Sequence, residues 1–306
     1  MDKRVGIIGC GWVGTSVAIS TLQSGVADAL WLHDLRHDLA EGEAMDLAHG
    51  AAFYPRCSVK AASLAQMRDA QVVVVAAGRG GKPGESRLDL LRDNARLVTD
   101  IGHTLAGFAG IVVMVSNPVD VLTQVMVQAS GLPPERVLGT GTMLDTARLR
   151  QRLGQGLGLA TQSVHAQVVG EHGDSEVVLW SGARVGGVAL RDWPDWDRTQ
   201  EPLLATEVRT AAYEVIRRKG ATNHAIGLVT ANLLRSLLRA ERRLLTVSRV
   251  QEGALGLQGV ALSLPTVVGQ DGGTLVVAPS MDEAEALALS ASAEVLKQAW
   301  RAIHPG

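Results

Sequence analysis

The sequence has few cysteines, few aromatic residues and no long run of like charges. Its 306 residues include two cysteines, Cys10 and Cys57, and no Cys or His spacing typical of a zinc site, so we expect neither disulfides nor a bound metal. Reduced cysteines favour a cytoplasmic protein. The 29 basic and 31 acidic residues give a net charge of −2, and no segment has five or more like charges, so nothing suggests a nucleic-acid-binding arm, an acidic tail or a membrane-binding patch.

Long apolar segments are also absent. No stretch approaches the roughly 18 residues that a membrane span requires, and a strand pattern begins at Arg4, which leaves no room for a signal peptide. We therefore expect no membrane or nucleic-acid partner, and infer that the partners are small molecules or protein chains. The length predicts two domains or one large one, and 34 glycines predict many tight turns.

Short β-branched segments alternate with helical patterns in the first half of the chain. The strands are expected at residues 5–8, 29–33, 72–76, 111–115 and 137–139, and helices between them include residues 13–22, 35–48 and 86–105. Because these strands are apolar throughout, helices must cover both faces of their sheet. The pattern predicts an α/β fold with a doubly wound parallel sheet of the Rossmann type.

The pattern changes after residue 141 and predicts a C-terminal α+β domain. Helices are expected at residues 144–153, 201–219, 225–240 and 282–302, and strands at residues 164–169, 177–180, 244–250, 260–264 and 274–277. No linker rich in proline or serine separates the halves, so we expect them to pack closely. We place the domains at residues 1–141 and 142–306.

A glycine motif follows the first predicted strand and opens a helix. Gly9 permits a tight turn, Gly11 lets a pyrophosphate approach the backbone, and Gly14 permits close packing of helix and strand. Asp34 ends the second predicted strand, where an acid accepts hydrogen bonds from the adenosine ribose and repels a 2′-phosphate. The pattern predicts NAD binding by residues 1–141; an ordinary glycine-rich turn with a solvated Asp34 is the alternative.

A histidine and one helix face carry further chemistry. His172 lies between Gly170 and Gly173 beyond a predicted strand, where it can donate and accept a proton near neutral pH. Helical spacing puts Asp145 and Arg148 on one face, so one helix presents an acid to orient His172 and a cation to bind a carboxylate. Arg150 points away from Arg148, because two residues turn an α-helix by about 200°, and must act elsewhere. A structural His172 is the alternative.

Two loops complete the set of candidates. Residues 78–90 are rich in glycine and include Arg87, so they form either a lid carrying a cation or a flexible surface loop. Asn117 closes the strand predicted at 111–115, where its amide faces the same crevice, although an Asn-Pro turn explains it equally well.

These motifs together resemble the L-lactate and malate dehydrogenase family. The glycine turn with Asp34 and the segments at 84–90, 116–120, 144–148 and 170–176 occur in the family's order, and the resemblance covers essentially the whole chain. Within the family the chain is most similar to the bacterial L-lactate dehydrogenases. The resemblance implies a Rossmann domain, an α+β substrate domain, and NAD as the cofactor.

The resemblance also implies a role for each site residue. His172 is expected to protonate the carbonyl oxygen of a 2-oxo acid, with Asp145 holding its imidazole and raising its pKa. Arg148 is expected to bind the substrate carboxylate as a bidentate pair. Arg87 is expected to polarise the carbonyl when the lid closes. Asn117 would position the nicotinamide and the reacting oxygen.

The residue six before the lid arginine faces the substrate side chain in this family, and here it is Gly81. Most lactate dehydrogenases have Gln there and malate dehydrogenases have Arg, so Gly81 disfavours a strict malate enzyme and admits bulkier 2-oxo acids. Arg79 or Lys82 is an alternative source of the cation. Thr222 would line the pocket. His224 lies just after it, in a segment where lactate dehydrogenases usually have larger aromatic residues.

Arg150 and His165 match the pair that binds fructose 1,6-bisphosphate between subunits of allosteric bacterial lactate dehydrogenases. The resemblance therefore implies a homotetramer activated by this effector; a surface Arg and a solvated His are the alternative.

We predict an L-lactate dehydrogenase that reduces pyruvate with NADH. The alternatives are a broader L-2-hydroxy-acid dehydrogenase, a malate dehydrogenase, and a catalytically silent dinucleotide-binding protein. Cys57, Trp193 and Trp196 receive no functional role.

Overall fold

The computed structural model describes residues 2–80 and 86–304, with the Arg87 side chain excepted. One nine-stranded sheet crosses the molecule in the order β14-β13-β12-β6-β5-β4-β1-β2-β3. Strands β1 to β6 run parallel, and they are β1 Arg4–Ile8, β2 Ala29–His33, β3 Ser58–Ala61, β4 Val72–Val75, β5 Ile111–Met114 and β6 Val137–Gly139. The strand order reverses between β1 and β4, which is where a doubly wound sheet binds its ligand.

The C-terminal half extends this sheet with antiparallel strands. They are β12 Arg243–Glu252, β13 Gln258–Gly269 and β14 Gly272–Val276. Strand β12 joins β6 through the pair Ser248 and Gly139. The two halves of the chain therefore share one sheet, which explains why no linker separates them.

Helices cover both faces of the parallel strands, as the doubly wound prediction requires. Because successive residues of a strand point to opposite faces, Val73 and Val75 of β4 belong to one core, and Val72 and Val74 belong to another. The first core includes α3 Arg87–Thr104, α4 Val119–Ser130 and α8 Glu283–Ile303, and the second includes α1 Trp12–Ser24, α2 His37–His49 and α7 His224–Leu238. The Rossmann-type fold class is thereby confirmed.

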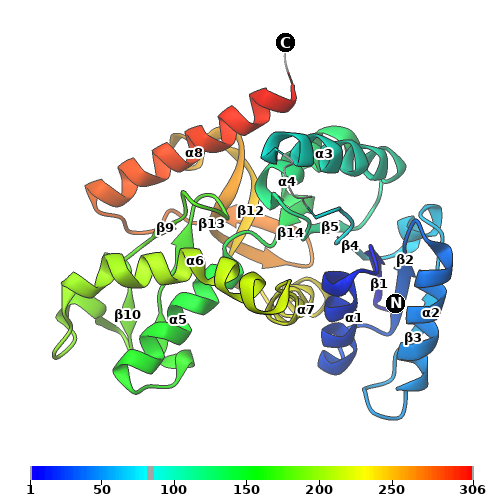
Figure 1. Ribbon diagram of the computed structural model, residues 1–306, viewed down its shortest axis with the longest axis horizontal. Helices are drawn as coiled ribbons and strands as arrows, with labels where there is room; N and C mark the ends of the chain where they lie inside the picture. The colour runs from blue at the N-terminus through cyan, green and yellow to red at the C-terminus, as the bar shows by residue number, and fades with distance from the viewer. Residues whose placement is uncertain (1, 81–85, 305–306) are drawn as a thin grey trace.

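A third core lies in the C-terminal domain, away from the large sheet. It packs α5 Met143–Leu157 and α6 Glu201–Lys219 against the short strands β7 Val164–His165, β8 Val168–Val169, β9 Val177–Val178 and β10 Arg184–Val185. Strand β11 Val188–Ala189 pairs with β10 at the edge of this region. Figure 1 shows α5, α6 and β10 in green on the opposite side of the molecule from the blue N-terminal strands. Trp180 and Trp196 lie with ring centroids 6.4 Å apart, and Trp193 packs against the same core. These rings therefore hold the loop before α6 in place.

The single strand predicted at residues 164–169 is wrong. Strand β7 pairs with β10, whereas β8 pairs with β9 in a separate sheet. The carbonyl of Ala166, between the two strands, accepts a hydrogen bond from Arg150 instead of a strand neighbour. Strand β3 was also missed, because its alternating exposed and half-buried residues lack the continuous apolar pattern of its neighbours.

The two domains also meet where α7 packs against α1. A Cβ atom on Gly227 of α7 would lie 2.5 Å from the carbonyl oxygen of Ser16, so only glycine permits this approach. Asn223, immediately before α7, donates a hydrogen bond from Nδ2 to Ser16 Oγ at 2.9 Å. The segment that carries Thr222 is therefore fixed beside the first helix of the dinucleotide-binding domain.

Candidate active site

The turn between β1 and α1 has the shape that a dinucleotide pyrophosphate requires. Gly9 has a φ of +100°, and a Cβ there would lie 2.6 Å from the backbone nitrogen of Ala77. A Cβ on Gly14 would overlap the carbonyl oxygen of Gly9 at 1.8 Å. A Cβ on Gly11, by contrast, would have no atom of the described residues within 4 Å. Gly9 and Gly14 are thus required by packing, whereas Gly11 leaves open space for a ligand.

Asp34 is held at the end of β2 by backbone donors. Its Oδ2 accepts a hydrogen bond from Cys10 N at 2.9 Å, and its Oδ1 accepts one from Arg36 N at 3.0 Å. Burial raises the pKa of this carboxyl, but the two backbone hydrogen bonds and the Arg36 charge outweigh it and lower the pKa. Asp34 is therefore ionised at neutral pH and joins the glycine turn to the strand beside it, in the position expected to receive the ribose.

Replacing Gly11 by valine is expected to weaken NADH binding strongly without unfolding the protein. The backbone at Gly11 is extended, with φ −77° and ψ −174°, so a β-branched residue is tolerated, and its side chain would occupy the pyrophosphate space. NADH fluorescence titration measures the loss, which we expect to exceed about 100-fold in Kd. Gly42→Ala on α2, which also meets no described atom, is the control; unchanged affinity of Gly11→Val would contradict this placement of the cofactor.

His172 lies in the loop of residues 170–176 that joins β8 to β9. Three separate elements anchor the backbone of this loop. Gly170 forms a bridge with Ser263 of β13, Glu171 N donates to Ser292 Oγ of α8 at 2.8 Å, and His172 N donates to Asp120 Oδ2 of α4 at 2.7 Å. The anchors fix the imidazole relative to both domains, and sequence reasoning assigned none of them a role.

Helix α5 supplies the acid and the cation that accompany His172. Asp145 is 2% exposed; its Oδ2 lies 2.6 Å from His172 Nδ1, and its Oδ1 accepts a hydrogen bond from Arg148 NH1 at 2.8 Å. The first turn of α5 is fixed because Thr142 Oγ1 donates to Val168 O at 2.6 Å. One buried carboxylate therefore orients both the imidazole and the guanidinium.

The electrostatics of this triad favour a protonated imidazole. Burial lowers the pKa of His172, but the Asp145 carboxylate, by charge and hydrogen bond, and then Asp120 raise it to about 9. Burial likewise opposes ionisation of Asp145, whereas His172 and Arg148 lower its pKa. His172 therefore carries a proton through the neutral range and is suited to donate it from Nε2, the ring nitrogen away from Asp145.

Asn94 organises the loop that follows β4. This residue of α3 is 3% exposed; its Oδ1 accepts from Arg79 N at 3.0 Å, and its Nδ2 donates to the carbonyls of Arg79 and Asn117. The side chain of Asn117 is exposed at the end of β5, beside the switch point of the sheet. Asn94 was missed by sequence reasoning, because a lone Asn within a helical pattern gives no signal for a buried amide.

The lid predictions fall largely outside the described residues. Gly81 and Lys82 are not among them, and for Arg87 the structure describes only the backbone, which begins α3 after the N-cap Ser86. Arg79 is described, and its guanidinium pairs with Asp93 of α3 at 2.7 Å. The predicted roles of Gly81 and Arg87 stay predictions.

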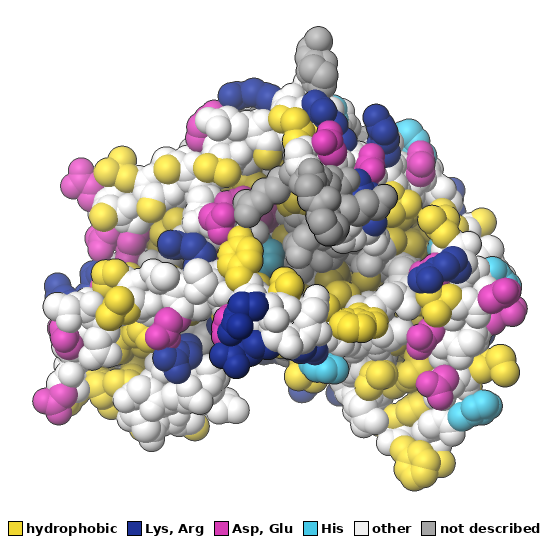
Figure 2. All heavy atoms as spheres, in the orientation of Figure 1, with side chains coloured by type: hydrophobic (Ala, Val, Ile, Leu, Met, Phe, Trp, Pro, Cys, Tyr) yellow, Lys and Arg dark blue, Asp and Glu magenta, His cyan; other side chains and the backbone are white. Residues whose placement is uncertain are grey.

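Thr222 lies between α6 and α7 and is half-buried. The preceding last turn of α6 carries Arg217, Arg218 and Lys219, and Figure 2 shows basic side chains gathered over this end of the helix. Lys219 Nζ donates to Asn223 Oδ1 at 2.7 Å, which fixes the chain on the far side of Thr222. Glu214 pairs with both Arg217 and Arg218, which offsets part of the positive charge at this end of the helix.

Arg150 and His165 line one cavity of about 290 Å³, away from the triad. Arg243 of β12 lines the same cavity, and no pattern in the sequence indicated this third basic residue. Burial, followed by repulsion from Arg243, lowers the pKa of Arg150. Its Nε donates to Ala166 O at 2.9 Å, which directs the guanidinium toward this cavity. The cavity therefore concentrates positive charge.

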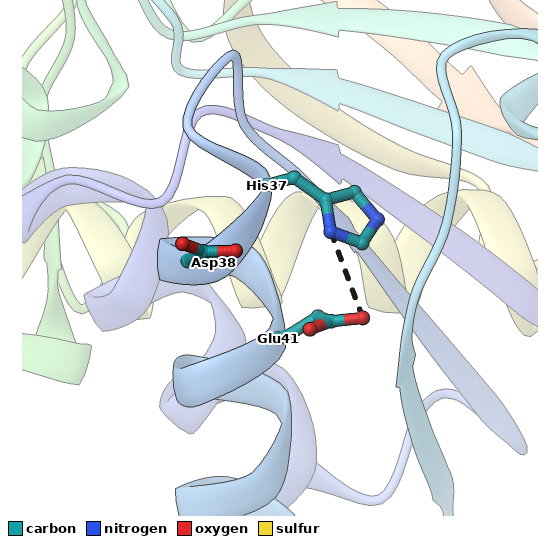
Figure 3. Close-up of side chains that lie close together, drawn as sticks. All are labelled: His37, Asp38 and Glu41. Atoms are coloured by element: carbon teal, nitrogen blue, oxygen red, sulfur yellow. Dashed lines mark ion pairs between the residues drawn. The ribbon is translucent and has the colours of Figure 1, made fainter.

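The described residues contain one cluster of potential metal ligands, drawn in Figure 3. It consists of His37, Asp38 and Glu41 on the first turns of α2, with His37 Nδ1 3.6 Å from Glu41 Oε1. All three side chains are exposed, and such groups commonly form on a helix surface without a metal.

Cys10 and Cys57 are free thiols, and burial raises their pKa to about 12 and about 11. Neither is suited to act as a nucleophile.

Comparison with known proteins identifies the family of this chain. Residues 3–139 match the lactate/malate dehydrogenase NAD binding domain, and residues 142–304 match the lactate/malate dehydrogenase alpha/beta C-terminal domain. The chain belongs to the lactate/malate dehydrogenase family. The predicted family and the predicted cofactor, NAD, are thus confirmed, and the protein is an NAD-dependent oxidoreductase.

Individual members of the dehydrogenase family resemble this chain along its whole length. An L-lactate dehydrogenase of Synechococcus sp. (strain JA-3-3Ab) is 44% identical over 295 residues, which cover 95% of this chain and 96% of that protein. The L-lactate dehydrogenase of Thermus aquaticus is 44% identical over 311 residues, covering 98% and 99%. The crystal structure of a minor L-lactate dehydrogenase from Enterococcus mundtii in a ligand-bound form superposes with a TM-score of 0.95 at 38% identity and covers 98% of both chains.

Proposed function

We propose that this dehydrogenase is an NAD-dependent L-lactate dehydrogenase that interconverts pyruvate and L-lactate. The observation that carries the proposal is the arrangement of His172 and Arg148 on the two oxygens of Asp145. A proton donor and a carboxylate-binding cation are thereby held by one buried acid, which suits a substrate with a carbonyl next to a carboxylate. The names of relatives along the whole chain support lactate as the hydroxy acid.

Each residue has a distinct task in this reaction. Arg148 binds the substrate carboxylate, and its planar guanidinium fixes the orientation of the adjacent carbonyl. His172 donates its proton to the carbonyl oxygen in pyruvate reduction and accepts it back in lactate oxidation. Asp145 holds Nδ1 and stabilises the imidazolium. The bound nicotinamide supplies or accepts the hydride. Asn117 and Thr222 are proposed to border the reacting group, with Gly81 facing the substrate side chain and Arg87 completing the site.

We further propose that the cavity lined by Arg150, His165 and Arg243 binds fructose 1,6-bisphosphate in a homotetramer. The support is its location away from the triad and its three basic side chains, since a phosphorylated ligand would relieve the repulsion between Arg150 and Arg243. Binding is expected to favour the active form with a coupling of about 1 to 3 kcal/mol.

A cytoplasmic location agrees with the two free cysteines. No described helix is long and apolar enough to span a membrane.

Steady-state oxidation of NADH with three 2-oxo acids tests the activity. Pyruvate, oxaloacetate and 2-oxo-4-methylpentanoate differ in the side chain that would face Gly81. We expect the highest kcat/KM with pyruvate. A preference for oxaloacetate would instead favour a malate dehydrogenase, with Arg79 or Lys82 supplying the cation. A preference for the branched acid would favour a broader L-2-hydroxy-acid dehydrogenase.

The effector is tested by repeating the pyruvate saturation curve with fructose 1,6-bisphosphate. We expect KM to fall by about 5- to 150-fold, the range that corresponds to the coupling above. The double substitution Arg150→Gln and His165→Gln removes two of the three basic side chains and is expected to eliminate the response while leaving basal turnover intact. Curves that superimpose with and without the bisphosphate, from about pH 5.5 to about pH 7.5, would contradict the effector proposal.

A further inference from the structure

Arg36 lies beside Asp34, just beyond the end of strand β2. Its backbone N–H donates to Asp34 Oδ1 at 3.0 Å, and its carbonyl accepts hydrogen bonds from Leu39 N at 3.0 Å and Ala40 N at 3.3 Å in the first turn of α2. Arg36 is therefore the N-cap residue of α2, with φ −86° and ψ 93°. Because its backbone is fixed on both sides, its side chain leaves the chain where the ribose of the cofactor is expected.

The guanidinium of Arg36 contacts the Asp34 carboxylate without being covered by it. The ion pair joins Arg36 Nε to Asp34 Oδ1 at 3.5 Å, which is longer than a normal hydrogen bond between such groups. The side chain of Arg36 is 74% exposed, whereas that of Asp34 is 14% exposed. Most of the guanidinium is therefore accessible to a ligand that reaches Asp34.

The charge of Arg36 also acts on the glycine turn. Asp34 Oδ2 accepts a hydrogen bond from Cys10 N at 2.9 Å, so one carboxylate joins this turn to the start of α2. Burial, followed by the charges of Asp34 and Glu43, raises the pKa of the Cys10 thiol, and the Arg36 charge opposes them. The guanidinium is thus close to the turn in which Gly11 leaves open space for the cofactor.

Asp34 is the only ion-pair partner of Arg36 in the part of the chain that the structure describes. The nearby acid Glu41 of α2 pairs with His37 at 3.6 Å, as Figure 3 shows. An exposed pair such as Arg36 with Asp34 contributes little to stability. A structural role therefore does not account for a cation at this place.

The two nicotinamide cofactors differ by one phosphate on the 2′-oxygen of the adenosine ribose. The 2′-hydroxyl of NADH donates to an acid such as Asp34, whereas the 2′-phosphate of NADPH carries a charge of about −1.5 to −2 and is repelled by it. The planar guanidinium of arginine binds a phosphate through two parallel hydrogen bonds. We propose that Arg36 gives this dehydrogenase a second cofactor, NADPH, by binding its 2′-phosphate beside Asp34.

The inference requires the adenosine ribose at Asp34 and is independent of the 2-oxo acid. Asp34 and Arg36 then have opposite effects on the choice of cofactor. The carboxylate favours NADH, and the guanidinium offsets part of its repulsion of NADPH.

Fluorescence titrations of NADH and NADPH test the proposal without any 2-oxo acid present. We expect the wild type to bind NADPH with a Kd about 10- to 100-fold above its Kd for NADH, because Asp34 still repels the phosphate. Arg36→Gln removes a charge-assisted contact that only NADPH makes. It should raise the Kd for NADPH by about 10- to 100-fold and the Kd for NADH by less than about 3-fold. Arg56→Gln, which removes an exposed charge beyond α2, is the control and should change neither.

Asp34→Asn provides a second background in which NADPH is expected to bind more tightly. Removing the carboxylate charge should lower the Kd for NADPH and raise the Kd for NADH, each by about 10-fold. Adding Arg36→Gln to this variant should again raise the Kd for NADPH by about 10- to 100-fold. Thermal unfolding checks that each variant is folded.

Three results would refute the proposal. An equal change in both Kd values on Arg36→Gln would show that Arg36 acts on a part that the two cofactors share. An unchanged Kd for NADPH in both backgrounds would exclude contact with the 2′-phosphate. Unchanged affinities in Asp34→Asn would place the ribose elsewhere. Absence of turnover on every 2-oxo acid would contradict the proposed function but would leave these affinities, and the inference, in place.

Discussion

His172→Asn is expected to lower kcat for pyruvate reduction by about 10²- to 10⁴-fold, the usual contribution of a positioned general acid. Asparagine retains a side chain of similar polarity but has no proton to donate to the carbonyl oxygen. NADH binding should be unchanged, because His172 contacts Asp145 and Asp120 rather than the glycine turn. Steady-state rates and NADH fluorescence titration measure the two effects. His49→Asn, at the exposed end of α2, serves as the control.

The pH profile gives this prediction a second measurable feature. Reduction requires the imidazolium, which is present below about pH 9 and is lost as pH rises through that value, so kcat/KM for pyruvate should decline there. Asp145→Asn removes the charge that raises the pKa of His172, and the decline should move to lower pH. If His172→Asn leaves turnover unchanged, the residue has no role in proton transfer. A wild type equally inactive would identify a catalytically silent dinucleotide-binding protein.

Arg148→Lys is expected to raise the KM for pyruvate by about 10- to 100-fold, which corresponds to loss of a charge-assisted hydrogen bond. Lysine keeps the positive charge but cannot form the planar bidentate pair with a carboxylate. It also cannot reproduce the NH1 contact with Asp145 at 2.8 Å while reaching the substrate, so kcat should fall as well.

The control for Arg148→Lys is Arg152→Lys, one turn further along α5. Arg152 pairs with Glu207 at the surface, where loss of one ion-pair geometry has little effect on stability or binding. Michaelis–Menten parameters for both variants, with pyruvate varied at saturating NADH, distinguish a site effect from a general effect on the helix. Equal KM values for Arg148→Lys and the wild type would exclude Arg148 from carboxylate binding.

Several features were predictable because they depend on local geometry. A continuous apolar segment such as β4 indicates a strand that is buried on both faces. The turn from Gly9 to Gly14 directly follows a strand, and its glycines stand where the backbone contacts require them. Asp145 and Arg148 share a helix face, and the structure places them in contact. The prediction that failed, a single strand at 164–169, concerned short segments whose partners are distant in sequence.

The residues that sequence reasoning missed act through contacts between distant elements. Asp120 follows Asn117 and Pro118 in a motif that drew attention to the amide, yet its carboxylate reaches the backbone of His172 from α4. Asn94 and Ser292 gave no signal, because polar residues in helical patterns are usually solvated. Their buried positions follow from how α3 and α8 pack around the loops.

The sequence by itself determined the fold class, the family and the cofactor, and it predicted Asp145, His172 and Arg148 as the central acid, base and cation. It did so because these depend on strand periodicity, glycine geometry and spacing within a single helix, all set by neighbouring residues. Only the tertiary structure decided that Asp145 is buried in contact with both His172 and Arg148, and that Arg243 joins Arg150 and His165. Burial and electrostatic proximity depend on the packing of separate elements, and that packing is what changes the protonation of a carboxyl group.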